Sequence, residues 1–66
     1  MLQKYKELKI KVGDYIYFVN EKGEGIDGNF EAELSNDSFR FFNNTTGRSE
    51  IVNISILQDI RKPENI

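Results

Sequence analysis

The chain has 66 residues, a formal net charge of −2 and apolar side chains at 38% of its positions. A chain of this length has room for one small domain, 1–66, and its composition is typical of a globular protein rather than a disordered one. It contains no cysteine and no histidine, which excludes disulfide bonds, thiol nucleophiles, histidine acid–base chemistry and the usual zinc and haem ligands. We therefore expect no metal site, no cofactor and no enzymatic activity.

The first twelve residues are rich in charge. Leu2, Tyr5 and Leu8 are spaced three apart among Lys and Glu residues, which is typical of a short amphipathic helix. Residues 1–12 are therefore expected to form either this helix or an extended lead-in. Charges interrupt the segment too often for a signal-peptide core, and no run approaches the ~18 apolar residues of a membrane span. We expect a cytoplasmic protein that does not interact with membranes.

The strongest strand signal is the segment Tyr15–Asn20, which is almost entirely β-branched or aromatic. One of its faces carries Ile16 and Phe18, and the other carries Tyr15 and Tyr17. Both faces are apolar, so we expect the strand to be covered on both sides or to meet another subunit on one face.

Polar and apolar residues alternate with period two after Gly25, which predicts a long second strand. Its outward face is acidic. Gly28 falls on the inward face, where the missing side chain allows the sharp bend that a small barrel needs to close. The positions expected to face inward are Ile26, Gly28, Phe30, Ala32 and Leu34.

A third strand is predicted from Phe39 to Asn43, after a turn at 35–38. Phe39 and Phe41 are expected to face inward, and Arg40 and Phe42 to face outward.

The last predicted elements are a fourth strand over Ser49–Ile54, one short helical turn within 53–57 and a closing strand over 58–61. Residues 62–66, which include the single proline, are expected to form a flexible tail. Five short strands at roughly ten-residue spacing predict an all-β fold, a small, strongly bent and partly open barrel.

The segment from Ile16 to Ile60 resembles the Sm-like small barrels, including the bacterial Hfq type. The features that match are the first strand, the glycines Gly23 and Gly28, the aromatic third strand and the apolar run Ile51–Ile56. The opening Lys11–Ile16, in which Gly-Asp precedes an apolar strand, is similar to SH3-like barrels. These two families share a strand count, and both remain open.

The Sm-like resemblance implies ring assembly, but its RNA-binding residues do not carry over. Arg40 follows Phe39 where that family has an Asn, and residues 53–55 stand where its basic run is expected.

Protein contact and self-association are the functions that the residues favour. A barrel of this size cannot bury all its aromatic residues, and exposed apolar area marks interfaces. The candidate binding residues are Tyr15, Tyr17, Arg40, Phe42 and Arg48. The aromatic residues would supply contact area, and the arginines would orient a carboxylate or phosphate.

Binding of RNA or single-stranded nucleic acid is the alternative function, since the aromatic residues could stack on bases and several lysines cluster near the N-terminus. The negative net charge opposes it. The spacing from Asn20 to Glu31 approaches that of a calcium loop, but Lys22 occupies a position that should ligate the ion, so no calcium site is expected.

Overall fold

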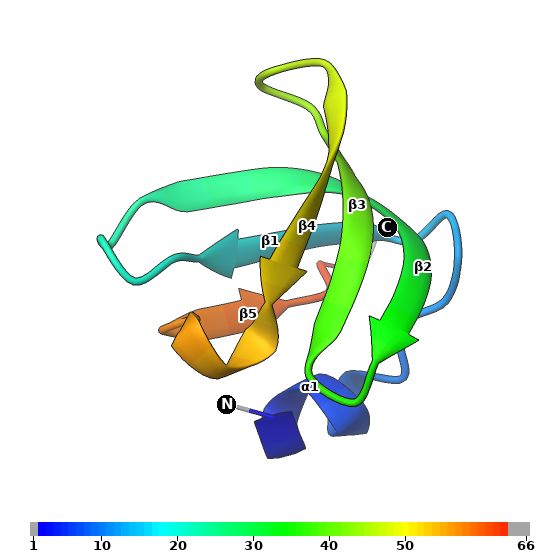
Figure 1. The fold of residues 1–66 in the computed structure, drawn as a ribbon, viewed down its shortest axis with the longest axis vertical. Coiled ribbons are helices and arrows are strands. Elements are labelled where there is room, and N and C mark those ends of the chain that lie inside the picture. Colours follow the sequence, from blue (N-terminus) through cyan, green and yellow to red (C-terminus); the bar gives the residue numbers. More distant parts are fainter. Residues whose placement is uncertain (1, 64–66) are drawn as a thin grey trace.

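The computed structural model describes residues 2–63. Five antiparallel strands form one bent sheet in the order β4-β3-β2-β1-β5, and a short helix precedes them (Figure 1). The sheet curls into a small globule without closing, which confirms the predicted all-β, five-stranded, partly open barrel. In chain order the elements are α1 (Leu2–Leu8), β1 (Tyr15–Val19), β2 (Gly25–Ser35), β3 (Ser38–Asn43), β4 (Arg48–Asn53), the 3₁₀ turn η1 (Ile54–Ile56) and β5 (Asp59–Arg61).

Alternating side chains on the inner face of the sheet form the core. Phe18 of β1 makes edge-to-face contacts with Phe39 and Phe41 of β3, with ring centroids 6.1 and 5.0 Å apart. Phe30 of β2 joins them at 5.3 Å from Phe39. The predicted alternation in β1 and β3 is confirmed, because Ile16, Phe18, Phe39 and Phe41 are all buried.

Gly28 allows β2 and β3 to approach each other closely at the point where β2 bends. It pairs with Ile16 of β1 and Asn43 of β3. A methyl group at Gly28 would lie 2.0 Å from the carbonyl oxygen of Phe42 and 3.0 Å from the ring of Phe41. The first of these atoms belongs to the backbone, so only glycine fits at this position without moving β3.

Leu34 is 46% exposed, and Ala32 pairs with the outward-facing Arg40, so the predicted inward orientation of these two residues is wrong. The pairing of β2 with β3 shifts register between Phe30 and Ala32 and again between Glu33 and Ser35. Each irregularity interrupts the alternation of side chains between the two faces. As a result Glu33 turns toward the helix and reaches the Tyr5 hydroxyl, 3.1 Å away.

The N-terminal segment forms the helix that was one of its two expected conformations. Tyr5 of α1 is 6% exposed and stacks on Phe39 with its ring 5.7 Å away and nearly parallel. The helix ends where Lys9 adopts a φ of 51°. Gly13 then donates a backbone hydrogen bond to Phe30 and begins the approach to β1.

The connection from β4 to β5 contains the predicted helical turn, η1. The Asn53 side chain accepts a hydrogen bond from the Ser55 amide at 2.9 Å and so caps the turn. Ile54 belongs to this turn rather than to the fourth strand, and it is buried. Residues 64–66 of the predicted tail lie outside the described residues, whereas Lys62 forms an ion pair with Asp14 at 3.0 Å.

Candidate binding surface

The outer face of the sheet brings several of the predicted binding residues together. Tyr15 of β1 pairs with Asn29 of β2, and Asn29 pairs with Phe42 of β3. These three residues form one row across the sheet, with adjacent strands about 4.8 Å apart. Tyr17 follows Tyr15 on the same face, and Arg40 precedes Phe42 on the same face. The outer surface therefore carries four of the five predicted residues.

Asp27 organises the polar part of this surface. Its Oδ2 accepts hydrogen bonds from the Tyr15 hydroxyl at 3.1 Å and from the Asn44 side-chain amide at 3.2 Å. The hydrogen bond to this carboxylate raises the pKa of the Tyr15 hydroxyl. Tyr15 is therefore held in place by a neighbouring carboxylate.

Tyr17 lies flat along β2. A methyl group at Gly25 would come within 2.2 Å of the Tyr17 hydroxyl oxygen, so the ring reaches over the glycine and is half-buried against it. Tyr17 pairs with Asp27 on one side and with Arg61 of β5 on the other.

Arg40 is already paired within the chain. Its Nε donates to Glu31 at 3.1 Å, and Ser49 donates to the other oxygen of the same carboxylate at 3.0 Å. A partner's carboxylate would have to compete with Glu31 for this guanidinium group.

Arg48 lies apart from the other four predicted residues. It pairs with Asn43 of β3, while its neighbour Ser49 pairs with Phe42. Since facing residues of paired strands point to the same side and adjacent residues alternate, Arg48 is on the face opposite Phe42. It is exposed at the start of β4.

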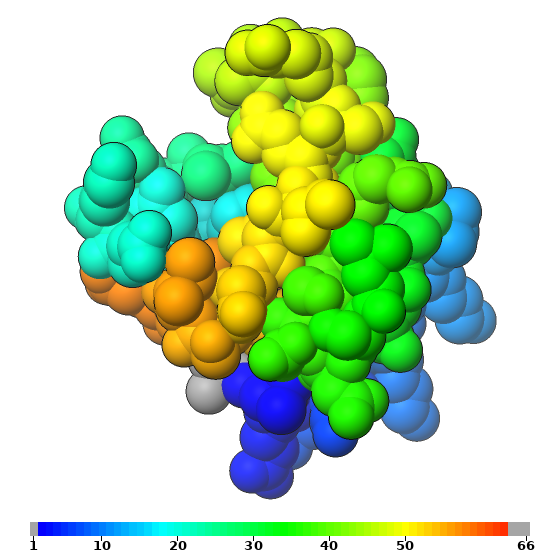
Figure 2. Space-filling view, in the orientation of Figure 1, coloured from blue at the N-terminus to red at the C-terminus, as the bar shows by residue number. Residues whose placement is uncertain are grey.

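Ile51 is the residue that the sequence analysis missed. It is 67% exposed, while Phe42 on the neighbouring strand is 39% exposed. Ile51 pairs with Arg40, so it lies on the same outer face as Phe42. The space-filling view shows β4 running along the molecular surface (Figure 2). The alternation of side chains along β4 could have identified Ile51. This alternation places Ser49 and Ile51 on one face of the strand and the half-buried Val52 on the other.

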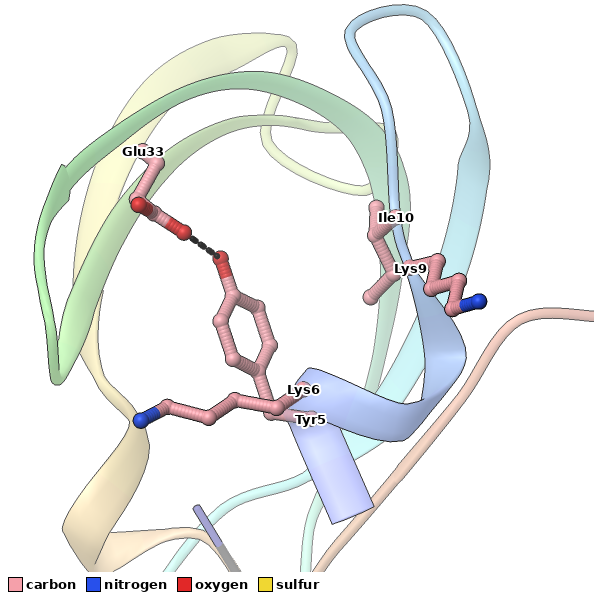
Figure 3. A pocket seen from close by; sticks show the side chains of 5 residues that line it. All are labelled: Tyr5, Lys6, Lys9, Ile10 and Glu33. Carbon is pink, nitrogen blue, oxygen red and sulfur yellow. Dashed lines mark hydrogen bonds between the residues drawn. The ribbon is translucent and has the colours of Figure 1, made fainter. Parts of the chain in front are cut away.

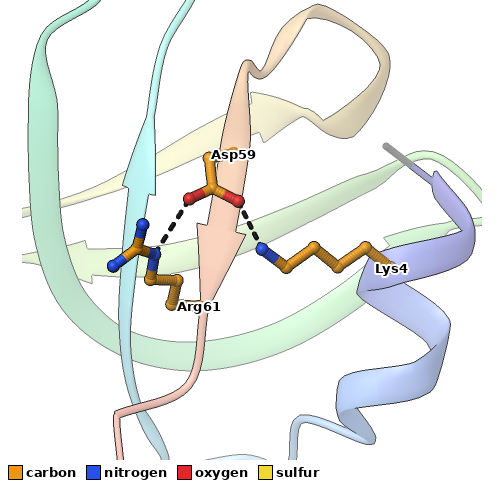
Figure 4. Close-up of polar contacts among 3 residues, drawn as sticks. All are labelled: Lys4, Asp59 and Arg61. Carbon is orange, nitrogen blue, oxygen red and sulfur yellow. Dashed lines mark hydrogen bonds and ion pairs between the residues drawn. The ribbon is translucent and has the colours of Figure 1, made fainter.

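A charged cluster ties α1 to the last strand. The carboxylate of Asp59 lies between Lys4 of α1 and Arg61 of β5 and accepts a hydrogen bond from each, the latter at 2.9 Å (Figure 4). These two cations lower the pKa of Asp59 to about 2. The Lys4–Asp59 pair joins α1 to β5, and Arg61 contacts Asp59 from the same strand, so the cluster is structural.

A shallow pocket of about 180 Å³ lies beside α1. Tyr5 and Glu33 are hydrogen-bonded across it, and Lys6, Lys9 and Ile10 complete the lining (Figure 3). Burial, reinforced by the bond to Glu33, raises the pKa of the Tyr5 hydroxyl to about 12. The lysine chains extend away from each other (Figure 3), so they do not converge on a single anion.

The loop that approaches calcium-loop spacing is a compact turn. The Asn20 side-chain oxygen accepts hydrogen bonds from the amides of Lys22 and Glu24, both at 2.9 Å, and its amide donates to the Glu24 carboxylate. Over residues 2–63, no three carboxylates gather as a metal site would require. Within the same range, no helix has the length and apolar character needed to cross a membrane.

Comparisons of this chain with protein-family models, curated proteins and solved structures find no match.

Proposed function

We propose that this chain is a non-enzymatic small-barrel binding or adaptor module that acts through contact with protein, including a second copy of itself. The observation that carries the proposal is the apolar outer surface formed by Phe42 and Ile51, which are 39% and 67% exposed. Their strands are adjacent and their side chains are on the same face. Large apolar side chains that gather outside a filled core mark interaction surfaces.

The architecture supports an Sm-like or SH3-like origin for such a module. A short helix precedes β1, Gly28 lies in a long second strand, and a helical turn precedes the short last strand. Gly28 is one of the features on which the resemblance was drawn from the sequence, and small barrels of both kinds serve as binding platforms.

Light scattering tests the proposal. We expect the purified protein to sediment or scatter as a multimer at ~100 μM and to dissociate on dilution, because association is governed by mass action. Ile51→Glu and Phe42→Glu should each shift the equilibrium toward the monomer. Val12→Glu is the matched control, since Val12 is 74% exposed and lies in the connection between α1 and β1 rather than in β3 or β4. A wild-type protein that stays monomeric at ~100 μM would remove self-association from the proposal.

Nucleic-acid binding is the second candidate. It is favoured by the row that aligns Tyr15 and Phe42 on one face, which resembles a stacking platform. The carboxylates of Asp27 and Glu31 on the same face oppose it, because phosphate neutralisation dominates such binding. A labelled U-rich or A-rich oligonucleotide should show no salt-dependent binding at ~50 mM salt. Binding that weakens steeply with salt would favour this candidate instead.

A further inference from the structure

We infer that the free edge of β4 is the surface through which two copies of this chain pair, as antiparallel strands related by a twofold axis at Ile51. This inference rests on the proposed self-association and adds its location, symmetry and register.

The edge of β4 is open and unusually unprotected. Among residues 2–63, β4 pairs with β3 alone, and each of its residues from Arg48 to Asn53 is in unbroken register with that neighbour. A bulge or a proline commonly blocks an exposed edge, and β4 has neither. Every second residue of an edge strand directs its N–H and C=O groups outward. These unpaired groups can form hydrogen bonds with the backbone of another strand.

The charged residue in the middle of β4 does not guard the edge. Glu50 is half-buried, and one of its carboxylate oxygens accepts from the Asn43 amide at 3.3 Å. The other accepts from the Thr46 hydroxyl at 2.8 Å. The side chain is thereby turned toward its own hairpin, which leaves Ser49, Ile51 and Asn53 as an uncharged outer row on β4.

Twofold symmetry restricts the pairing to a few registers. In such a pair one residue faces its own copy, and flanking residues face each other across it. An axis at Glu50 would set like charges opposite each other, which destabilises a strand pair. An axis at Ser49 would pair only 48–50, because the turn resumes at Gly47, whose φ is 72°. An axis at Ile51 pairs all of 49–53 and sets Glu50 opposite Val52.

The register centred on Ile51 also buries the most exposed apolar side chain of β4. Ile51 is 67% exposed in the single chain and would pack against its own copy. Facing Cβ atoms in antiparallel strands lie about 4.5–5.5 Å apart. The two outer faces would then be continuous, with Phe42 of each copy flanking the new contact.

The opposite edge of the sheet is a poorer partner for β4. β5 has three residues, and its Asp59 is committed to Lys4 of α1 and to Arg61 (Figure 4). Head-to-tail pairing of β4 with β5 would offer a shorter ladder than pairing β4 with itself. Twofold pairing therefore covers the longer of the two free edges and closes the assembly at a dimer.

Single-cysteine cross-linking tests the register, because the chain has no cysteine of its own. In the inferred dimer the two Ile51→Cys positions have Cα atoms about 4.5–5.5 Å apart, which suits a disulfide. We expect this variant to form a covalent dimer under mild oxidation. Ser49→Cys alone should not cross-link, because its two copies would lie about 13 Å apart. A mixture of Ser49→Cys and Asn53→Cys should cross-link as a heterodimer. Val12→Cys is the exposed control, since Val12 is 74% exposed and lies outside β3 and β4, and it should remain uncross-linked.

Each other outcome overturns a defined part of the inference. If the wild-type protein scatters as a dimer but Ile51→Cys does not cross-link, the proposed function stands and the β4 interface is wrong. Cross-linking of Ser49→Cys alone would overturn the Ile51 register. Equal cross-linking of Val12→Cys would indicate random collision and remove the support for β4. Multimers larger than a dimer would overturn the twofold arrangement, and a monomeric wild-type protein would overturn self-association together with its interface.

Discussion

The inner and outer faces of the same bent sheet are built from alternating residues of the same strands, yet they are organised differently. On β3, Phe39 and Phe41 pack among three other aromatic rings, whereas Arg40 and Phe42 face outward. The side chains of the inner face are packed together by the burial of apolar surface. On the outer face, hydrogen bonds to Asp27 and Glu31 position the side chains. The inner face therefore determines stability, and the outer face can change with little cost to the fold.

The sharpest test of this contrast replaces two phenylalanines of one strand. Phe39→Ala should cost about 3–5 kcal/mol, because it leaves a cavity among packed rings. That is enough to unfold a domain whose total stability is of the order of 5 kcal/mol. Phe42→Ala should cost less than about 1 kcal/mol. Urea unfolding followed by circular dichroism measures both, and equal losses would contradict the assignment of the two faces.

Gly28→Ala should be the next most damaging change. The added methyl group would lie 2.0 Å from the Phe42 carbonyl oxygen, and overpacking of this kind costs about 1–3 kcal/mol or more. Gly25→Ala is the matched control, because its methyl group meets only the far end of the Tyr17 side chain, which can swing aside. Thermal unfolding of the two variants should differ clearly; similar melting temperatures would argue against the close approach of β2 and β3.

The buried hydroxyl of Tyr5 should make the fold sensitive to alkali. Its pKa is raised from 10.0 to about 12 in the folded chain. The neutral hydroxyl therefore contributes fully to the free energy of unfolding below pH 10, and this contribution is lost as the pH rises toward 12. Tyr5→Phe keeps the ring on Phe39 and should lose about 0.5–1 kcal/mol at neutral pH. The variant should also show a smaller loss of stability in alkali. Urea midpoints from pH 8 to about 12 measure the effect, and an unchanged alkaline profile would contradict it.

The smallest expected effect concerns the surface ion pairs of Asp59. Its pKa falls from 3.8 to about 2 on folding, so its stabilisation is present above pH 3.8 and is lost as the pH falls toward 2. Asp59→Asn should weaken this acid dependence. Because surface ion pairs are screened by salt, the difference in stability between Asp59→Asn and the wild-type protein should be smaller in ~1 M NaCl. Urea midpoints between pH 2 and 5 provide the measurement, and a difference that grows with salt would contradict the expectation.

The sequence was sufficient for the strands whose alternation is uninterrupted. In β1 and β3 each residue alternates regularly between the faces, so Ile16, Phe18, Phe39 and Phe41 could be assigned to the core from hydrophobic pattern alone. The bend at Gly28 was also predictable, because a glycine on the inward face of a long strand indicates a close approach.

The sequence was insufficient where tertiary pairing changes the alternation. Leu34 faces solvent because two irregularities in the β2–β3 pairing interrupt the pattern, and nothing in the local residue types marks them. Tyr5 is buried only because α1 packs against the barrel, which its own short pattern does not specify. For the candidate site, alternation assigned Phe42 to the outer face but could not identify its neighbours. The row from Tyr15 through Asn29 to Phe42 depends on strand register.

The strand order has a consequence for how the chain reaches its native state. β2, β3 and β4 are joined by short connections, whereas β5 must return to β1, where Val19 faces Asp59 about forty residues away. Closing a longer loop costs more chain entropy, and distant contacts slow folding. We therefore expect the three-stranded meander to nucleate folding and β5 to dock late. Substitutions at Ile60 should then mainly accelerate unfolding, whereas those at Phe41 should slow folding, and stopped-flow kinetics with the opposite pattern would reverse this order.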